Sequence, residues 1–254
     1  MAHIFLASPN TVNKAICVFN TYNNVEAKGD GWGILPGVSE DRIKMKELLE
    51  TYYDIIEMVD QIDIEDGVTK ALRRWQDEKI DRLHFHYSGH GIFNQTVETN
   101  NSNHKVLHSE TTFGPCIVGN NGDKSLCSIL TIQSLMARAN ADIITLTLDC
   151  CRDLDRPRSR HKVKLAKLPV ISTEDWKRIA TIYSTCLTQT ARDRRSFSQE
   201  LCKVIRSTKY GRVAFKQIAK LVNESWHKDG LTSQLCNIDL REVGDNWDKV
   251  YWPQ

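Results

Sequence analysis

Ile143-Ile144-Thr145-Leu146-Thr147-Leu148, followed by Asp149-Cys150-Cys151-Arg152, is the stretch that decides the fold. The first six residues are apolar or β-branched and include no Gly or Pro, which predicts a fully buried strand. Two thiols and a carboxylate therefore lie where this strand runs out into a loop. In open α/β sheets, ligands bind beyond the carboxyl ends of the strands, so we expect a functional site at this point.

A second strand of the same kind, Leu83-His84-Phe85-His86-Tyr87, runs out into Ser88-Gly89-His90-Gly91. If the two strands are parallel neighbours, Cys151 and His90 face each other across one cleft. An imidazole can activate a thiol as a nucleophile and can later protonate a leaving amine. His84 and His86 alternate along the strand, so we expect them to pack or to hydrogen-bond locally rather than to bind a metal.

The other apolar patterns alternate between strand and helix spacing. They predict strands at 14–20, 54–59 and 179–186, and helices at 42–52, 64–76, 128–140, 197–205 and 213–226. The polar stretch 94–112 is expected to be an exposed loop, and Gly119-Asn120-Asn121-Gly122 is typical of a hairpin turn. This order predicts an α/β fold with a mostly parallel central sheet and helices on both faces.

The residues before the helix predicted at 42–52 indicate where it begins. Ser39 would be its N-cap, and Glu40 and Asp41 would be acidic residues of its first turn, where they interact favourably with the helix dipole. Ile43 is expected among its apolar positions.

Length and composition are those of an ordinary globular chain. The 254 residues are 41% hydrophobic and 26% charged, and the net charge of +2 is too small to favour nucleic acid as the main partner. No apolar stretch approaches the ~20 residues of a membrane span. The start lacks the features of a signal peptide, so we expect no membrane association.

The eight cysteines fall mostly inside apolar runs. Without a signal peptide, this pattern favours buried free thiols in a reducing cytoplasm over disulfides. The chain contains no CxxC pair, so a structural zinc site is not expected.

Residues 152–169 are rich in Arg and Lys and carry almost nothing apolar. We interpret this segment as a solvated linker. It also offers candidate cleavage sites at Arg158, Arg160 and Lys162.

The order of the motifs resembles a known family. Tyr87-Ser88-Gly89-His90-Gly91 followed by Asp149-Cys150-Cys151-Arg152 resembles the histidine and cysteine motifs of the caspase-like proteases, which comprise caspases, paracaspases and metacaspases. The resemblance covers nearly the whole chain from about Ala15. It implies a caspase-like fold and a cysteine endopeptidase, with His90 as acid/base and Cys151 as nucleophile. Acyl transfer also needs donors for the oxyanion, and the N–H groups of Gly91 and Cys151 are the candidates.

The same resemblance implies a single catalytic domain over 1–254. Its large-subunit-like part is 1–155, its basic linker 152–169 and its small-subunit-like part 170–254. Polypeptides would be its substrates, a homodimer would form through an edge strand of the C-terminal half, and the family links it to programmed cell death. Metacaspases often need calcium, but we find no compact carboxylate cluster that demands it and expect no cofactor or metal.

Charge indicates the residue preferred at P1, the substrate position before the cleaved bond. Caspases use arginines to bind an acidic P1, whereas Asp149 is a carboxylate here, as in paracaspases and metacaspases, which cut after Arg or Lys. Asp193 and Ser88 are further candidates for this pocket, and a carboxylate pair would bind a guanidinium by charge-assisted hydrogen bonds. Leu35 falls near one caspase pocket arginine. Arg192, next to Asp193, leaves a preference for Asp open.

The sequence leaves two alternative functions open. The chain could be a catalytically silent caspase-like scaffold, although it retains both His90 and Cys151. It could also be an Asp-specific caspase proper, with Arg192 in the pocket.

Overall fold

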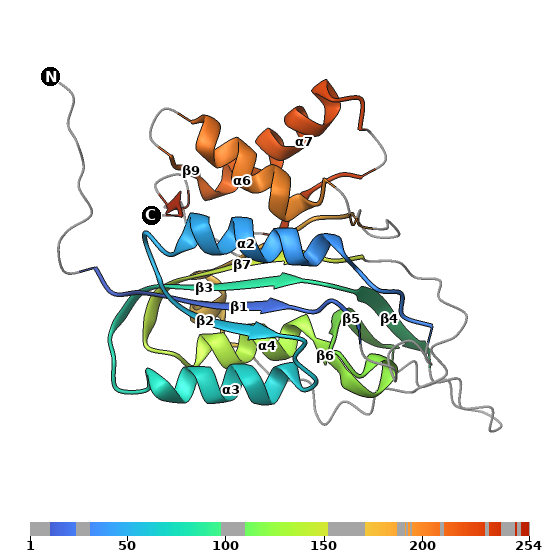
Figure 1. The fold of residues 1–254 in the computed structure, drawn as a ribbon. Coiled ribbons are helices and arrows are strands. Elements are labelled where there is room, and N and C mark those ends of the chain that lie inside the picture. The colour runs from blue at the N-terminus through green and yellow to red at the C-terminus, as the bar shows by residue number, and fades with distance from the viewer. Residues whose placement is uncertain are drawn as a thin grey trace, which may run out of the picture.

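Six strands form the central sheet of the computed structural model, in the order β10-β8-β7-β3-β1-β2 (Figure 1). They are β1 (Asn13–Phe19), β2 (Asp54–Val59), β3 (Ile80–Ser88), β7 (Ala141–Asp149), β8 (Ile179–Tyr183) and β10 (Asn237–Asp239). Only β10 runs antiparallel to its neighbour. The structure describes residues 11–23, 31–97, 110–151, 171–186, 191, 193, 195–208, 211–231, 234–239, 247 and 250–253.

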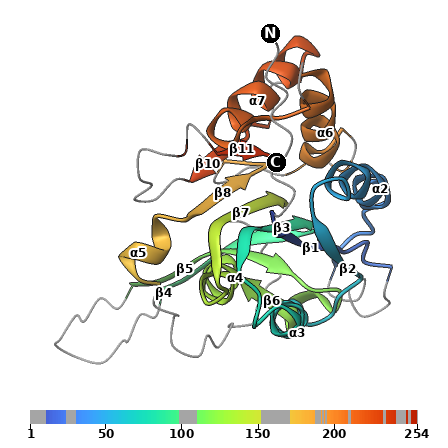
Figure 2. The same cartoon turned by 90° about the vertical axis from the view of Figure 1, so that its left-hand side faces the viewer.

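Helices cover both faces of this sheet (Figures 1 and 2). One face carries α2 (Gly37–Leu49), α6 (Phe197–Ser207) and α7 (Ile218–Lys228), and the other carries α3 (Ile64–Arg74) and α4 (Ile129–Ala137). The short helix α5 (Thr173–Trp176) precedes β8. Because the parallel strands are covered on both sides, their sequences are nearly continuous apolar runs.

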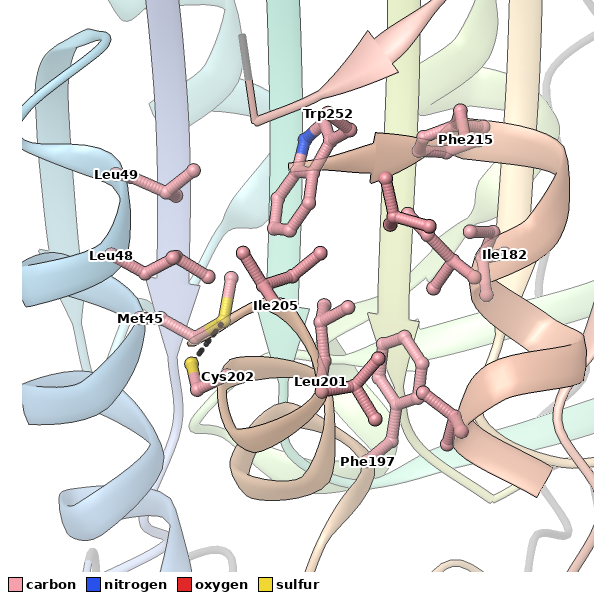
Figure 3. Close-up of a cluster of buried hydrophobic side chains, with 14 of the residues drawn as sticks. Met45, Leu48, Leu49, Ile182, Phe197, Leu201, Cys202, Ile205, Phe215 and Trp252 are labelled. Atoms are coloured by element: carbon pink, nitrogen blue, oxygen red, sulfur yellow. Dashed lines mark hydrogen bonds between the residues drawn. The ribbon is translucent and has the colours of Figure 1, made fainter. Parts of the chain in front are cut away.

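The larger core lies between the sheet and the α2–α6–α7 layer (Figure 3). Helix α6 presents Phe197, Leu201 and Ile205 on one stripe, and all three are fully buried. Cys202 meets Met45 of α2 at 3.6 Å between the sulfur atoms. Trp252, close to the end of the chain, is 1% exposed and closes this core over β3.

One face of the two central strands departs from this apolar pattern. The parallel register places His84 beside Thr145, His86 beside Thr147 and Ser88 beside Asp149. These residues face the α2–α6–α7 layer, because the alternate residues of both strands pack in the core under α3 and α4. A row of buried polar side chains therefore runs along the sheet to its carboxyl end.

Two small sheets complete the structure. The strands β4 (Gly91–Val97), β5 (Glu110–Val118) and β6 (Leu126–Ser128) lie beyond the carboxyl end of the main sheet, with the 3-10 turn η1 (Gly122–Ser125) between β5 and β6. The strand β9 (Val213–Ala214), which continues into the 3-10 turn η2 (Phe215–Gln217), pairs with β11 (Tyr251–Trp252).

The α/β fold class is confirmed, and so are the main strands and helices, but several expectations were wrong in detail. Helix α2 begins at Gly37 with Pro36 as N-cap, so Ser39 is not its N-cap, and it ends at Leu49. The stretch 94–112 is not simply a loop, because β4 and β5 occupy its two ends. The first residues of 213–226 form β9 rather than a helix. The chain does turn back after β5, but the connection to the antiparallel strand β6 covers residues 119–125 and includes η1.

None of the helices among the described residues is both long and apolar enough to cross a membrane.

Candidate active site

Cys151 follows the end of β7, where hydrogen bonds hold both the N–H and the carbonyl of the preceding residue, Cys150. The N–H of Cys150 donates to Ser184 Oγ at 3.1 Å, and the carbonyl of Cys150 accepts from Ser184 Oγ and Thr185 Oγ1 at 3.2 and 3.1 Å. The side chain of Cys150 is buried, whereas Cys151 is half-buried. The backbone N–H of Ala191 donates to Cys151 Sγ at 3.2 Å. A donor aimed at sulfur favours negative charge there.

His90 follows the end of β3 and is held in a shell of aromatic residues. Its ring lies 4.5 Å from the ring of Tyr22 and 5.0 Å from that of Trp32, between centroids. Tyr22 Oη accepts from the backbone N–H of His90 at 3.1 Å, and Tyr87 Oη donates to its carbonyl at 2.7 Å. These contacts fix both the backbone and the ring plane.

A single hydrogen bond shows which ring nitrogen of His90 carries the hydrogen. Nε2 lies 2.7 Å from the carbonyl oxygen of Gly33. A carbonyl only accepts, so Nε2 carries the hydrogen, and in the neutral ring Nδ1 is the basic nitrogen. The imidazole is therefore oriented to use Nδ1 as a base.

The two strand ends lie side by side. The N–H of Gly89 donates to the carbonyl of Asp149 at 3.1 Å. A β-carbon on Gly91 would lie 2.6 Å from the carbonyl oxygen of Cys151 and 2.8 Å from Cys150 Sγ, so only glycine allows this approach. The backbone of β4 thus starts directly against the cysteine pair.

A cavity of about 170 Å³ opens between these strand ends. Its lining includes the predicted residues His90, Cys151, Asp149, Ser88 and Asp193, so the structure brings these five together. Gly91 is not part of the lining, although it touches the backbone of Cys151. The complete lining is Leu35, Val38, Asp41, Ser88, Gly89, His90, Asp149, Cys151, Ala191 and Asp193.

Asp149 is 4% exposed and accepts two hydrogen bonds from one residue. The backbone N–H and the hydroxyl of Ser198 both donate to its Oδ2 at 2.8 Å. Burial raises the pKa of Asp149, and the bonds from Ser198 oppose that rise. No Lys or Arg is among the described residues that line the cavity, and within that part of the chain serine donors, with Ser198 first, favour the charged form of this carboxylate.

Asp41 is a pocket carboxylate that the sequence analysis missed. It was expected to be a first-turn acid of a helix, but it is 2% exposed and points into the cavity from α2. Ser196 Oγ and Ser88 Oγ donate to it at 2.6 and 2.7 Å, and Gln199 Nε2 donates at 3.0 Å. Burial raises the pKa of Asp41 to about 7, and the charge of Asp149 adds to the shift. Ser88 therefore positions Asp41.

The helical spacing of the inward-facing residues in α2 could have indicated Asp41 from the sequence. The buried residues of α2 are Val38, Asp41, Met45, Leu48 and Leu49, which follow helical spacing. An acid within such a stripe faces the protein interior. Ile43, which was expected to be apolar and inward, is 59% exposed because it falls off this stripe.

Asp193 is the third carboxylate of the cavity. Its Oδ1 accepts from the backbone N–H of Gly37, at the start of α2, at 2.9 Å. A β-carbon on Gly37 would collide with the carbonyl oxygen of Asp193, so glycine at 37 permits this contact. This hydrogen bond holds Asp193 against the start of α2.

The structure does not describe every predicted residue. Arg192 and the candidate cleavage sites Arg158, Arg160 and Lys162 lie outside the described residues. Within the described part of the chain, no group of three or more His, Cys, Asp or Glu side chains is arranged to hold a metal ion.

Comparison with protein families agrees with this geometry. The family model described as Caspase domain matches residues 15–238, which is most of the chain. The chain therefore belongs to the caspase-domain family, a family of cysteine-type peptidases. A search of curated proteins found no match.

Proposed function

We propose that this protein is a cysteine endopeptidase that cleaves polypeptides after Arg or Lys. The observation that carries the proposal is the lining of one cavity, where a half-buried thiol and an oriented imidazole stand beside three carboxylates. The membership in a family of cysteine-type peptidases supports the reaction class. The paracaspase- or metacaspase-like preference rests on the pocket charges alone.

In the proposed reaction, His90 Nδ1 takes the proton of the Cys151 thiol, and the thiolate attacks the carbonyl carbon of the scissile bond. The N–H groups of Gly91 and Cys151 stabilise the oxyanion of the tetrahedral intermediate. The imidazolium then protonates the leaving amine, which departs and leaves a thioester. Water, activated by the same nitrogen, hydrolyses the thioester and restores the thiol.

The pocket acids determine the P1 preference. A guanidinium or ammonium group entering the cavity would meet Asp41, Asp149 and Asp193 and form charge-assisted hydrogen bonds with them. An acidic P1 side chain would be repelled by the same charges. Cleavage of the chain itself after Arg158, Arg160 or Lys162 would suit this pocket and stays a prediction.

A peptidyl electrophile with P1 Arg tests this proposal. We expect a peptidyl acyloxymethyl ketone to alkylate Cys151, located by peptide mass spectrometry, and we expect Cys151→Ala to abolish both labelling and turnover of a fluorogenic Arg peptide. Cys186→Ala is the matched control, because Cys186 is the other half-buried thiol, and it should change neither. If Cys151 stays unlabelled in folded protein and no peptide turns over, the protein is a silent scaffold.

A further inference from the structure

A line of buried polar side chains leads from the Trp252 end of the core to the acidic pocket. All its members are at most 4% exposed, and the reaction proposed above uses only the last: Thr145, His84, Thr147, His86, Ser198 and Asp149. At the far end, the ring of His84 is covered by Trp252 and Tyr53, with centroids at 5.2 and 5.9 Å. The line is therefore closed to water at one end and open to the cavity at the other.

The hydrogen bonds along this line are continuous. Thr145 Oγ1 lies 2.9 Å from His84 Nδ1, and His84 Nε2 lies 3.2 Å from Thr147 Oγ1. Thr147 Oγ1 lies 2.9 Å from His86 Nδ1, and His86 Nε2 lies 3.3 Å from Ser198 Oγ. Ser198 Oγ donates to Asp149 Oδ2 at 2.8 Å.

The line follows directly from the sheet register and one helix. The parallel pairing of β3 with β7 sets each histidine beside a threonine on the same face. Helix α6, which lies over these strands, brings Ser198 in its first turn to the end of the line. The three elements therefore supply one polar path through an otherwise apolar core.

The donor and the acceptor of each hydrogen bond along this path can be assigned from the number of hydrogens that each side chain carries. Burial lowers the pKa of His86 to about 3 and that of His84 below its usual value, so each ring is neutral and has one N–H. When Asp149 is an anion, Ser198 must give it its hydroxyl hydrogen, and His86 must then donate from Nε2 to Ser198. His86 Nδ1 can only accept from Thr147.

The same count continues beyond Thr147. With its hydrogen given to His86, Thr147 accepts from His84 Nε2, and His84 Nδ1 accepts from Thr145. Every hydrogen then points toward Asp149. Donors that point the same way polarise one another, which strengthens the bond at the end of the line.

This support matters because Asp149 has acids and thiols around it. Among the described residues, the titratable groups that face it are Asp41 from α2, Cys236 from the segment before β10, and Asp193, Cys151 and His90 across the cavity. None of these groups is a Lys or an Arg, so none carries a permanent positive charge. The hydrogen-bond donors of Ser198, and the line behind them, therefore favour its negative charge against burial and repulsion.

We propose that His84, Thr147, His86 and Ser198 are positioning residues that hold Asp149 in place as an anion and so strengthen the preference of the pocket for a cationic P1 side chain. The P1 part of this inference rests on the proposed function, whereas the support of the Asp149 anion does not.

Thr147→Val tests the line three hydrogen bonds away from Asp149, since it replaces the hydroxyl by a methyl group and keeps the shape of the side chain. The matched control is Thr181→Val. Thr181 is a buried strand threonine on the opposite face of the sheet, bonded to Gln133 Nε2 at 3.0 Å. For a fluorogenic Arg peptide we expect KM to rise about three- to tenfold in Thr147→Val, with a smaller change in kcat, and to stay within about twofold in the control.

Two NMR readouts do not depend on catalysis. In wild type at neutral pH, ¹⁵N spectra should show His84 and His86 both protonated at Nε2. The ¹³C carboxyl titration of Asp149, assigned with Asp149→Asn, should move to higher pH in Thr147→Val and should not move in Thr181→Val. Should Thr147→Val fail to fold, Thr145→Val breaks the line at its far end with the same expected direction.

The outcomes separate the two proposals. A hydrogen on Nδ1 of His86 in wild type, or equal Asp149 titrations in Thr147→Val and Thr181→Val, overturns the positioning role even if Arg peptides are cleaved. If no Arg or Lys peptide is cleaved but both NMR results appear as expected, the line supports the Asp149 anion and the P1 assignment fails.

Discussion

Asp41 is the pocket carboxylate whose charge changes near neutral pH. Its pKa is raised from 3.8 to about 7, first by burial and then by the charge of Asp149. A cationic P1 group would interact most strongly with Asp41 once it is ionised. The activity on Arg peptides should therefore rise with pH through about 7.

Asp41→Asn should lower kcat/KM for an Arg peptide by about tenfold to a hundredfold, the size of one lost charge-assisted hydrogen bond. Glu40→Gln is the control, because this neighbouring acid is exposed and pairs only with Lys44 among the ion pairs that the structure describes. An equal loss in both variants would contradict the pocket assignment.

The same residue predicts how stability depends on pH. Because the pKa of Asp41 is higher in the folded protein than in the unfolded chain, the folded state holds a proton that the unfolded chain releases between about pH 4 and pH 7. This contribution is present at low pH and is lost as the pH rises through that window. Thermal unfolding of Asp41→Asn should consequently show a smaller fall in Tm from about pH 5 to pH 8 than that of wild type.

At the scale of single residues, the sequence indicated those candidate site residues that lie at the ends of apolar strands or shortly after them. His90, Cys151 and Asp149 were predicted because a strand end is visible as the end of an apolar run. Asp41 was missed because an acid near a helix start has a common explanation in the helix dipole. The carbonyl of Gly33 and the N–H of Ala191 were missed because backbone groups leave no trace in residue identity.

Among the elements, the start of β4 at Gly91, directly after His90, determines how closely the chain there approaches Cys150 and Cys151. A β-carbon at Gly91 has no room, since both nearest neighbours are parts of Cys150 and Cys151. Gly91→Ala should therefore lower kcat by at least about tenfold in a protein that still folds, because small displacements at the reacting groups are costly.

Gly67→Ala is the matched control for this prediction. Gly67 lies in α3 on the other face of the sheet, and its β-carbon would meet the flexible side chain of Met58 from β2, so activity should not change. Steady-state kinetics and circular dichroism of both variants are the measurements. Full activity in Gly91→Ala would contradict the close approach.

The elements themselves differ in how well the sequence predicts them. Strand β2 was predicted with its observed bounds, Asp54–Val59, because a short β-branched run bounded by polar residues is distinctive. Strands β4 and β5 were missed in part because 94–97 and 110–112 are largely polar and pair with each other outside the main sheet. Helix α2 was placed too late because Ser39 resembles an N-cap, although no side chain caps this helix.

For the molecule as a whole, the C-terminal strand β11 ties the end of the chain to the centre of the sheet. Trp252 is 1% exposed, pairs through β11 with β9 and packs with its ring tilted against His84 of β3. Such long-range contacts cannot be seen in sequence periodicity. The two-residue strand β11 was accordingly not predicted.

Trp252→Ala should lower the free energy of unfolding by about 3–5 kcal/mol, the usual cost of removing a large buried aromatic side chain. Tyr251→Ala, in the same strand, is the control and should cost about 1 kcal/mol or less, because Tyr251 is 41% exposed. Urea unfolding followed by tryptophan fluorescence and circular dichroism measures both. Similar losses would show that the chain end does not close the core.

Strand β10 is an edge of the main sheet. The homodimer expected through an edge strand of this half stays a prediction, as do the cytoplasmic location and the link to programmed cell death.

The most direct test of the account is a P1 positional-scanning library of fluorogenic peptides, run on wild type and on Cys151→Ala. We predict turnover confined to P1 Arg and Lys in wild type, and none in the variant. A preference for P1 Asp would contradict the acidic pocket, and turnover that survives in Cys151→Ala would contradict the thiol mechanism.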